Sequence, residues 1–311
     1  MKLACVFPGQ GSQSLGMLAA LADAFPQVRE TFQEASEVLG LDLWTLTQDG
    51  PIDDLNRTEN TQPAMLAAGV AVWRVWTAQG GSEPMLMAGH SLGEYTALVC
   101  ADALDFDTAV RLVAERGRLM QNAVPAGEGA MAAILGLDDE QVRTVCREAA
   151  DVGVVEAVNY NAPGQVVIAG QTAAVERAIA LASEAGAKRS VKLPVSVPSH
   201  CSLLKAAATN MHARLESVRV GTPAIRVIHN VDVASHAEPD VIRAALAAQI
   251  HRPVRWVETV QAMVSDGVDT VLELGPGKVL TGLNKRIDKS LTVACVQDPD
   301  SLAQALALGA S

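Results

Sequence analysis

The sequence has few aromatic residues and fewer basic than acidic residues. Phe, Trp and Tyr make up 3% of its 311 residues, too few for the stacking surfaces that bind single-stranded nucleic acid. The 24 Lys and Arg residues against 35 Asp and Glu residues give a net charge of −11. This charge argues against a general nucleic-acid binder, whose affinity depends on neutralising phosphates. It does not exclude a local basic patch, because net charge says nothing about distribution.

Cysteines are also few, and long apolar runs are lacking. The five cysteines are widely spaced and form no C-x-x-C pair: Cys5, Cys100, Cys146, Cys201 and Cys295. This pattern predicts neither a disulfide framework nor a metal site, and it is typical of a reducing cytoplasm. No apolar run reaches the roughly 18 residues of a membrane span, and the run before Pro8 is too short for a secretory signal. We therefore expect a cytoplasmic protein that does not bind membranes.

What is present is the pattern of an α/β protein. Hydrophobic residues make up 49% of the chain and charged residues 19%, which is enough apolar surface to bury a core. Short β-rich runs alternate with longer Ala- and Leu-rich segments of helical period. Buried strands are predicted at Leu3–Phe7, Met85–Ala88 and Thr270–Leu274, and helices at Thr61–Gln79 and Asp107–Ala123.

The order of elements changes in the middle of the chain. From about residue 130 it becomes β-α-β-β-α-β, the split or ferredoxin-like unit, which can form a small four-stranded subdomain. We therefore predict an inserted ferredoxin-like subdomain at 128–196, within a discontinuous α/β catalytic domain formed by 1–127 and 197–311. The elements predicted for the insertion are Met131–Leu135, Asp138–Ala150, Val154–Tyr160, Gln165–Ala169, Thr172–Ala185 and Ser190–Val195.

Gly89-His90-Ser91-Leu92-Gly93 matches G-x-S-x-G and falls between a predicted strand and a predicted helix, as the motif requires. A sharp turn at this place exposes the serine hydroxyl, and the following N–H, that of Leu92, points toward the site of a developing oxyanion. The alternative interpretation is an ordinary glycine-flanked helix start with Ser91 as its N-cap. The flanking strand and helix favour the nucleophile.

Ser91 needs a base to remove its proton, and six histidines are candidates. His200 leads because it ends an extended run and precedes a predicted helix, whose dipole favours the neutral, proton-accepting imidazole. On the residues alone, His251 and His229 remain alternatives. The other three are assigned structural or surface roles: His90 beside the nucleophile, His212 on a solvated helix face and His236 in a polar loop.

Two further segments bear on the site. The turn Gly9–Gln13 lacks the pattern of a phosphate-binding loop, but its small residues allow close approach to Ser91, which makes the Gln10 N–H a candidate second oxyanion donor. Arg116 lies in a predicted helix with mixed faces. It is either a solvated or ion-paired helix residue or a bidentate carboxylate ligand, and its position in the pattern does not decide between the two.

Motifs along almost the whole chain resemble those of bacterial malonyl-CoA:acyl-carrier-protein transacylases, in the acyltransferase family of fatty-acid and polyketide synthesis. Because the motifs are many and occur in the right order, the resemblance is specific. They are Val6–Gln13, Thr61–Ala64, Ala88–Tyr95, Glu115–Gln121, Asn159–Gln165, Leu193–His200, Pro253–Trp256 and Glu273–Leu280.

The resemblance implies an activity and a role for each site residue. Malonyl would pass from malonyl-CoA to the phosphopantetheine thiol of acyl carrier protein, in fatty-acid biosynthesis, by a ping-pong cycle through an acyl-serine. Ser91 would be acylated, His200 would act as base and then as acid, and Arg116 would hold the malonyl carboxylate. Gln10 and Leu92 would form the oxyanion hole, and the backbone carbonyl of Gln249 would orient the histidine in place of a buried acid.

The resemblance also implies a hydrolase-like core with a parallel sheet, no bound cofactor and no metal. The carrier protein of such systems is typically acidic, so a basic cluster is expected to dock it. The first candidate cluster is Lys278, Lys285, Arg286 and Lys289, and the second is Lys188, Arg189 and Lys192.

Three other functions compete with this expectation. A discrete acyltransferase of a polyketide or malonate decarboxylase system would share the fold and the site. A serine esterase or thioesterase would use the same G-x-S-x-G with a triad acid and a late histidine such as His251, but the ferredoxin-like insertion speaks against it. A non-catalytic carrier-protein scaffold would require the loss of Ser91 or His200, and both are present.

Overall fold

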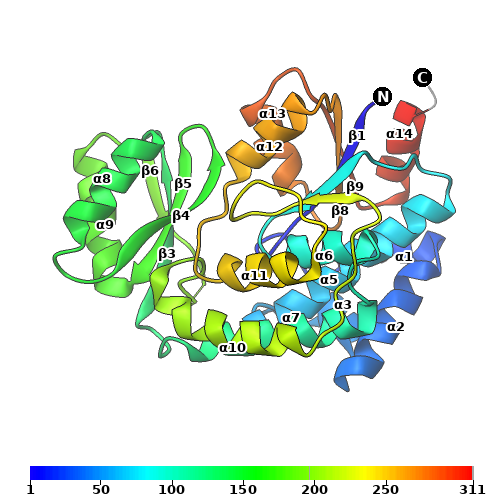
Figure 1. Cartoon of the computed structure of the whole chain (residues 1–311), viewed down its shortest axis with the longest axis horizontal. Coiled ribbons are helices and arrows are strands. Elements are labelled where there is room, and N and C mark those ends of the chain that lie inside the picture. The colour runs from blue at the N-terminus through cyan, green and yellow to red at the C-terminus, as the bar shows by residue number, and fades with distance from the viewer. Residues whose placement is uncertain (196, 310–311) are drawn as a thin grey trace.

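The computed structural model describes residues 1–195 and 197–309, which form two β-sheets. One sheet has five strands in the order β7-β2-β1-β8-β9, all parallel. The other has four strands in the order β4-β5-β3-β6, all antiparallel. The antiparallel sheet and its two helices form the green lobe of Figure 1, apart from the remaining elements. This arrangement confirms the predicted α/β class with a separate antiparallel unit.

The three central strands of the parallel sheet are buried, as expected for a sheet covered by helices on its faces. Its strands are β1 (Leu3–Phe7), β2 (Leu86–Gly89), β7 (Arg226–Ile228), β8 (Thr270–Leu274) and β9 (Thr292–Val296). Every residue of β1 and β8 is buried. Both strands have the predicted bounds, because β1 is a continuous apolar run and β8 is apolar except for Thr270 and Glu273. β2 lies one residue later than predicted.

Helices surround this sheet. The longest, α5 (Thr58–Ala78), is almost entirely buried and begins three residues before its predicted start. The polar residues 58–60 carry no apolar period to mark this earlier start, and Pro63 lies in the second turn of the helix. No helix of the described residues is both long and apolar enough to cross a membrane. The other helices are α1 (Ala19–Ala24), α2 (Gln27–Leu39), α3 (Leu43–Asp49), α4 (Ile52–Leu55), α6 (Gly93–Cys100), α7 (Phe106–Asn122), the 3₁₀ turn η1 (Ser202–Leu204), α10 (Lys205–Glu216), α11 (Pro239–Gln249), α12 (Trp256–Ser265), α13 (Val279–Ile287) and α14 (Pro299–Gly309).

The antiparallel unit has the predicted β-α-β-β-α-β order. Its elements are β3 (Gly129–Leu135), α8 (Asp139–Ala149), β4 (Val155–Ala162), β5 (Gln165–Gln171), α9 (Thr172–Glu184) and β6 (Arg189–Lys192). Asp138 caps α8 in a capping box with Gln141. β6 ends at Lys192 rather than at Val195, since the Val195 N–H turns back to the Leu193 carbonyl. The domain limits at 128 and 196 stay a prediction, and Ser196 lies outside the described residues.

Backbone hydrogen bonds join the two units. The Tyr160 N–H donates to the Val254 carbonyl (3.0 Å), and the Val254 N–H donates to the Val158 carbonyl (2.8 Å). A segment of the large unit thereby extends the edge strand β4 of the small one. The pairing of Val254 with β4 holds Asn159 at the edge of the small sheet, where it lines the same pocket as the turn that follows β2.

Candidate active site

The turn from β2 into α6 holds Ser91 in a left-handed backbone conformation, with φ 52°. The two flanking glycines make this turn feasible. A Cβ on Gly93 would lie 2.1 Å from the Phe7 carbonyl oxygen, and one on Gly89 would lie 1.8 Å from the Gly93 carbonyl carbon. The G-x-S-x-G pattern is therefore required by backbone crowding, as a nucleophile turn predicts.

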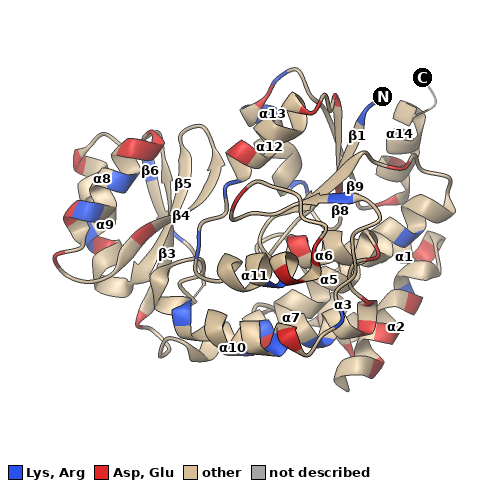
Figure 2. Cartoon of the chain, viewed as in Figure 1, with Lys and Arg blue, Asp and Glu red and all other residues tan. Residues whose placement is uncertain are grey.

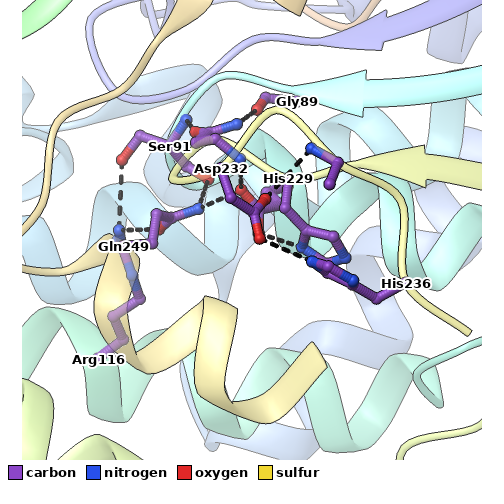
Figure 3. Close-up of polar contacts among 10 residues, drawn as sticks. Gly89, Ser91, Arg116, His229, Asp232, His236 and Gln249 are labelled. Atoms are coloured by element: carbon purple, nitrogen blue, oxygen red, sulfur yellow. Dashed lines mark hydrogen bonds and ion pairs between the residues drawn. The ribbon is translucent and has the colours of Figure 1, made fainter. Parts of the chain in front are cut away.

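The side chain of Asn230 hydrogen-bonds the backbone of this turn at two places. Its Oδ1 accepts a hydrogen bond from the Ser91 N–H (2.7 Å), and its Nδ2 donates to the Gly89 carbonyl (2.7 Å). Because both ends of the amide are used, the loop after β7 fixes the strained backbone (Figure 3). Asn230 was missed by sequence analysis, since only the folded chain brings it to the turn.

The structure brings His200 to the serine hydroxyl. Ser91 Oγ lies 2.7 Å from His200 Nε2, and His200 Nδ1 lies 2.7 Å from the Gln249 carbonyl oxygen. A carbonyl can only accept, so Nδ1 carries the proton and Nε2 is free to accept one from Ser91. Burial, followed by the positive charge of Arg116, lowers the pKa of His200 to about 3. The imidazole is therefore a neutral base near pH 7.

Arg116 reaches the same hydroxyl from α7. It is 1% exposed, and its Nη2 lies 3.2 Å from Ser91 Oγ and 2.8 Å from Gln249 Oε1. Its Nη1 donates to Gln62 Oε1 at 2.8 Å, while Nε is buried without a partner. Burial lowers its pKa, but from so high an ordinary value that the group stays charged.

Among the described residues, no carboxylate is in direct contact with this buried cation. None of the ion pairs found across 1–195 and 197–309 includes Arg116. Buried charges are ordinarily paired or bound to a ligand. The arrangement therefore suits an anion that arrives with a substrate, and it does not fit the solvated helix arginine that the sequence left open.

The two expected oxyanion donors lie on adjoining segments, Gln10 in the loop after β1 and Leu92 in the Ser91 turn. A Cβ on Gly9 would lie 2.5 Å from the His90 carbonyl oxygen, so this loop packs directly on the Ser91 turn. Within the described part of the chain, neither the Gln10 N–H nor the Leu92 N–H donates to a protein acceptor. Both residues line the pocket that contains Ser91.

That pocket has a volume of about 360 Å³ and lies between the two units. The large unit supplies the polar residues described above, and the small unit supplies Met131 and Asn159. Much of the remaining wall is apolar, including Met120, Leu193 and Val197. A pocket with this wall can hold an extended acyl chain or thioester arm over the hydroxyl and restrict water there.

Of the six histidines, all of which are described, only His200 contacts Ser91. His90 bonds Asn161 Oδ1 (2.8 Å), and His229 bonds Glu94 (2.8 Å) inside the core. His251 is about half-buried and lines a separate groove between α10 and α11. The remaining two pair with acidic residues at the surface: His212 with Glu216 and His236 with Asp232.

Comparison with known proteins supports the resemblance. Residues 4–303 match the model of the acyl transferase domain family. The chain belongs to this acyl transferase family. The malonyl CoA-acyl carrier protein transacylase of Escherichia coli K12 is 55% identical over 307 residues, 99% of each chain. The protein of the same name from Haemophilus influenzae is 57% identical over 298 residues, 96% of each chain.

Solved structures of acyl transferases superpose closely on this one. An acyl carrier protein S-malonyltransferase from Vibrio cholerae matches with a TM-score of 0.95 and 57% identity, over 98% of this chain and 99% of that one. A malonyl-transacylase in complex with its type II PKS acyl-carrier protein matches with a TM-score of 0.98 and 56% identity, over 99% and 100% of the chains. The fold of the chain is thus that of solved family members.

The candidate docking residues of this acyl transferase are exposed. Lys278, Lys285, Arg286 and Lys289 lie on or beside α13, but Arg286 donates to the Gln165 side chain and the Pro163 carbonyl in the small unit. In the second cluster, Lys192 pairs with Glu176 at 2.8 Å. Figure 2 shows basic residues on both lobes rather than on a single face.

Two more polar residues of the acyl transferase site, Gln62 and Glu94, were not predicted, and Gln249 was predicted only for its backbone carbonyl. Gln62 and the side chain of Gln249 hold Arg116, and Glu94 bonds Gln249. Gln62 falls in a motif quoted only for the resemblance. Glu94 offered a signal of its own, an acidic residue directly after G-x-S-x-G, but its partners are 135 to 155 positions away.

Proposed function

We propose that this acyl transferase moves malonyl from malonyl-CoA to the phosphopantetheine thiol of an acyl carrier protein in fatty-acid biosynthesis. The observation that carries the proposal is the meeting of Ser91, the neutral His200 and the carboxylate-free Arg116 at one hydroxyl. Similarity to transacylases named for this activity supports it.

In the first half-reaction, Arg116 binds the free malonyl carboxylate by charge-assisted hydrogen bonds. His200 Nε2 takes the Ser91 proton as Oγ attacks the thioester carbonyl. The Gln10 and Leu92 N–H groups stabilise the oxyanion of the tetrahedral intermediate. The C–S bond then breaks, His200 returns the proton to the thiolate, and CoA-SH leaves the malonyl-serine ester.

The second half-reaction reverses these steps with a new thiol. The phosphopantetheine thiol of the carrier protein enters the site, His200 takes its proton, and the sulfur attacks the ester carbonyl. Collapse of the intermediate breaks the C–O bond and returns the proton to Ser91. Nucleophile, base, oxyanion donors and carboxylate-binding cation all come from the chain, so we propose no bound cofactor.

The geometry favours transfer over the esterase alternative. His200 Nδ1 bonds a backbone carbonyl, that of Gln249, where an esterase triad would place a carboxylate. The physiological carrier is a separate question, because one structural relative is in complex with a type II PKS acyl-carrier protein. We propose the fatty-acid carrier as the first candidate and the polyketide carrier as the alternative.

Transfer rates to a carrier protein test the function. We expect transfer from malonyl-CoA to exceed transfer from acetyl-CoA strongly, because acetyl leaves Arg116 unpaired. Arg116→Ala is expected to lower malonyl transfer by about two orders of magnitude and acetyl transfer much less. Equal losses for both acyl groups would contradict the assigned role of Arg116, and net hydrolysis of malonyl-CoA without transfer would contradict the proposed reaction.

We also propose that the cluster at Lys278, Lys285, Arg286 and Lys289 docks the carrier. Because Arg286 contacts the small unit, the test reverses Lys285 and Lys289 to Glu. The KM for carrier protein is expected to rise several-fold while self-acylation by malonyl-CoA is unchanged. The matched control reverses Lys188 and Arg189, and a larger effect there would move the docking site to the second cluster.

Two further expectations stay proposals. The large domain is proposed to comprise 1–127 and 197–311, with 128–196 inserted as a subdomain. The cytoplasm is proposed as the location, since all five cysteines are free.

A further inference from the structure

Glu94 is a fully buried carboxylate in the first turn of α6, three residues after Ser91. Its Oε1 accepts a hydrogen bond from His229 Nδ1 (2.8 Å). Its Oε2 accepts from the Asn230 N–H (2.9 Å) and from Gln249 Nε2 (2.9 Å). No Lys or Arg of the described chain forms an ion pair with it. Burying a carboxylate is costly even when it is hydrogen-bonded, so its presence here calls for a role.

The contacts of Gln249 indicate what that role is. Its Nε2 donates to both Glu94 Oε2 and the Ser91 carbonyl (2.9 Å each), and its Oε1 accepts from Arg116 Nη2 (2.8 Å). Because a carboxylate only accepts hydrogen bonds, Glu94 holds the NH₂ of the amide toward itself. The amide oxygen must then face the guanidinium, which Figure 3 shows extending toward Ser91 and Gln249.

The opposite amide orientation would be unfavourable at both ends. Rotating the Gln249 amide by half a turn would place its oxygen against the Glu94 carboxylate and its NH₂ against the Arg116 guanidinium. Glu94 therefore acts on Arg116 through one intervening amide, without touching it. A carboxylate in direct contact with Arg116 would instead occupy the cation that a substrate carboxylate needs.

We propose that Glu94 is a positioning residue for selection of a carboxylate-bearing acyl group. It fixes the Gln249 amide so that Arg116 is held beside Ser91 yet left unpaired for the substrate. This inference rests on the proposed function, because it concerns the same malonyl-binding cation.

The test compares malonyl and acetyl self-acylation rates in Glu94→Gln. A neutral amide at position 94 keeps the shape of the side chain but can turn its own NH₂ toward Gln249, which leaves the Ser91 carbonyl as the acceptor that holds the Gln249 NH₂. The malonyl-to-acetyl ratio of acylation rates is expected to fall about tenfold, as for loss of one charge-assisted hydrogen bond. An equal fall for both acyl groups, or no fall, would overturn the inference.

A variant that exchanges the two side chains tests whether the position of the carboxylate matters, or only the presence of one carboxylate and one amide. Glu94→Gln combined with Gln249→Glu keeps one carboxylate and one amide, but it moves the carboxylate to position 249, in direct contact with the Arg116 guanidinium. The ratio is expected to stay low, because the new carboxylate competes with malonyl. Recovery of the wild-type ratio would overturn the inference. If Glu94→Gln alone fails to fold, the ratio measured in the exchange variant replaces it as the test.

Glu273→Gln is the matched control. Glu273 is also fully buried, but it accepts from the Leu280 and Thr281 N–H groups and is not among the residues that line the pocket. Its substitution is expected to leave the malonyl-to-acetyl ratio unchanged, whatever it does to the melting temperature. Failure of the wild-type protein to accept malonyl would contradict the proposed function, whereas a wild-type ratio in Glu94→Gln would contradict only the role of Glu94.

Discussion

Two of the turns that lead from a strand of the parallel sheet into a helix differ in which residues adopt positive φ angles. The turn from β2 to α6 places Ser91 there, with φ 52°. The turn from β8 to α13 uses Gly275 (φ 143°) and Gly277 (φ 80°), which adopt such conformations without steric cost. The comparison teaches that a side chain is held in a strained conformation where its hydroxyl is needed, and that glycine serves where no side chain is required.

The two turns also differ in how they use a buried glutamate. Glu273 accepts the Leu280 and Thr281 N–H groups (3.0 and 2.7 Å) and so satisfies the first turn of α13. Burial raises its pKa, although those N–H donors oppose the shift. Glu94 bonds mostly side chains and the backbone of a distant loop. The same residue type completes a helix in one turn and organises a pocket in the other.

Ser91→Ala removes the feature that distinguishes the first turn, and its effect on activity should be the largest. We expect acyl transfer to fall by at least about 10⁴-fold, since no other group near His200 can form the acyl-enzyme. The measurement is malonyl transfer to carrier protein, with thermal melting as the check on folding. Substantial residual transfer by a folded variant would mean that Ser91 is not the nucleophile.

Gly93→Ala tests whether crowding sets the first turn. The added Cβ would lie 2.1 Å from the Phe7 carbonyl oxygen, and a backbone atom cannot move away cheaply. The free energy of unfolding is expected to drop by about 3 kcal/mol, measured by denaturant titration. A drop below about 1 kcal/mol would show that the turn can relax.

Gly277→Ala is the counterpart in the second turn. Its Cβ would meet only Ser12, at 3.5 Å or more, so the cost is the left-handed backbone alone. We expect a loss of about 1 kcal/mol in the free energy of unfolding and unchanged acyl transfer. A loss of unfolding free energy as large as that of Gly93→Ala would contradict the claim that backbone crowding is specific to the Ser91 turn.

The smallest effect on activity is expected from lowering the pH from about 8 to 5. The neutral imidazole of His200 is the active form, and protonation removes it. Burial lowers its pKa from an ordinary 6.5 to about 3, so the loss of activity moves to acid pH. The kcat/KM for malonyl-CoA should be flat from about pH 8 to 5, in rate measurements on the wild-type protein. An inflection near pH 6.5 would contradict the buried, neutral base.

Much of the fold could be predicted from the sequence, and the errors in the predicted bounds have physical causes. β1 and β8 have their predicted bounds because both are buried along their whole length and mainly apolar, with Glu273 as the one charged exception. β6 was extended too far because Leu193 and Val195 are apolar for a different reason: they line the pocket. The four helices between residues 19 and 55 were not predicted at all.

The site was predicted unevenly for a similar reason. Ser91 is marked by its own neighbours in the sequence, whereas His200 led the other histidines only modestly until the resemblance was considered. The side-chain contacts of Glu94, Asn230 and Gln249 described above span 133 to 158 positions. Such pairings depend on the folded backbone, and no local pattern marks them.

The account depends most on Ser91 carrying the acyl group, and peptide mapping after a brief incubation with malonyl-CoA tests this directly. In the absence of carrier protein, the account predicts one malonyl group per chain, on the peptide that contains Ser91, and its discharge when carrier protein is added. A stable malonyl group on any other residue, or malonyl transfer with no labelled Ser91 peptide at any time, would contradict it.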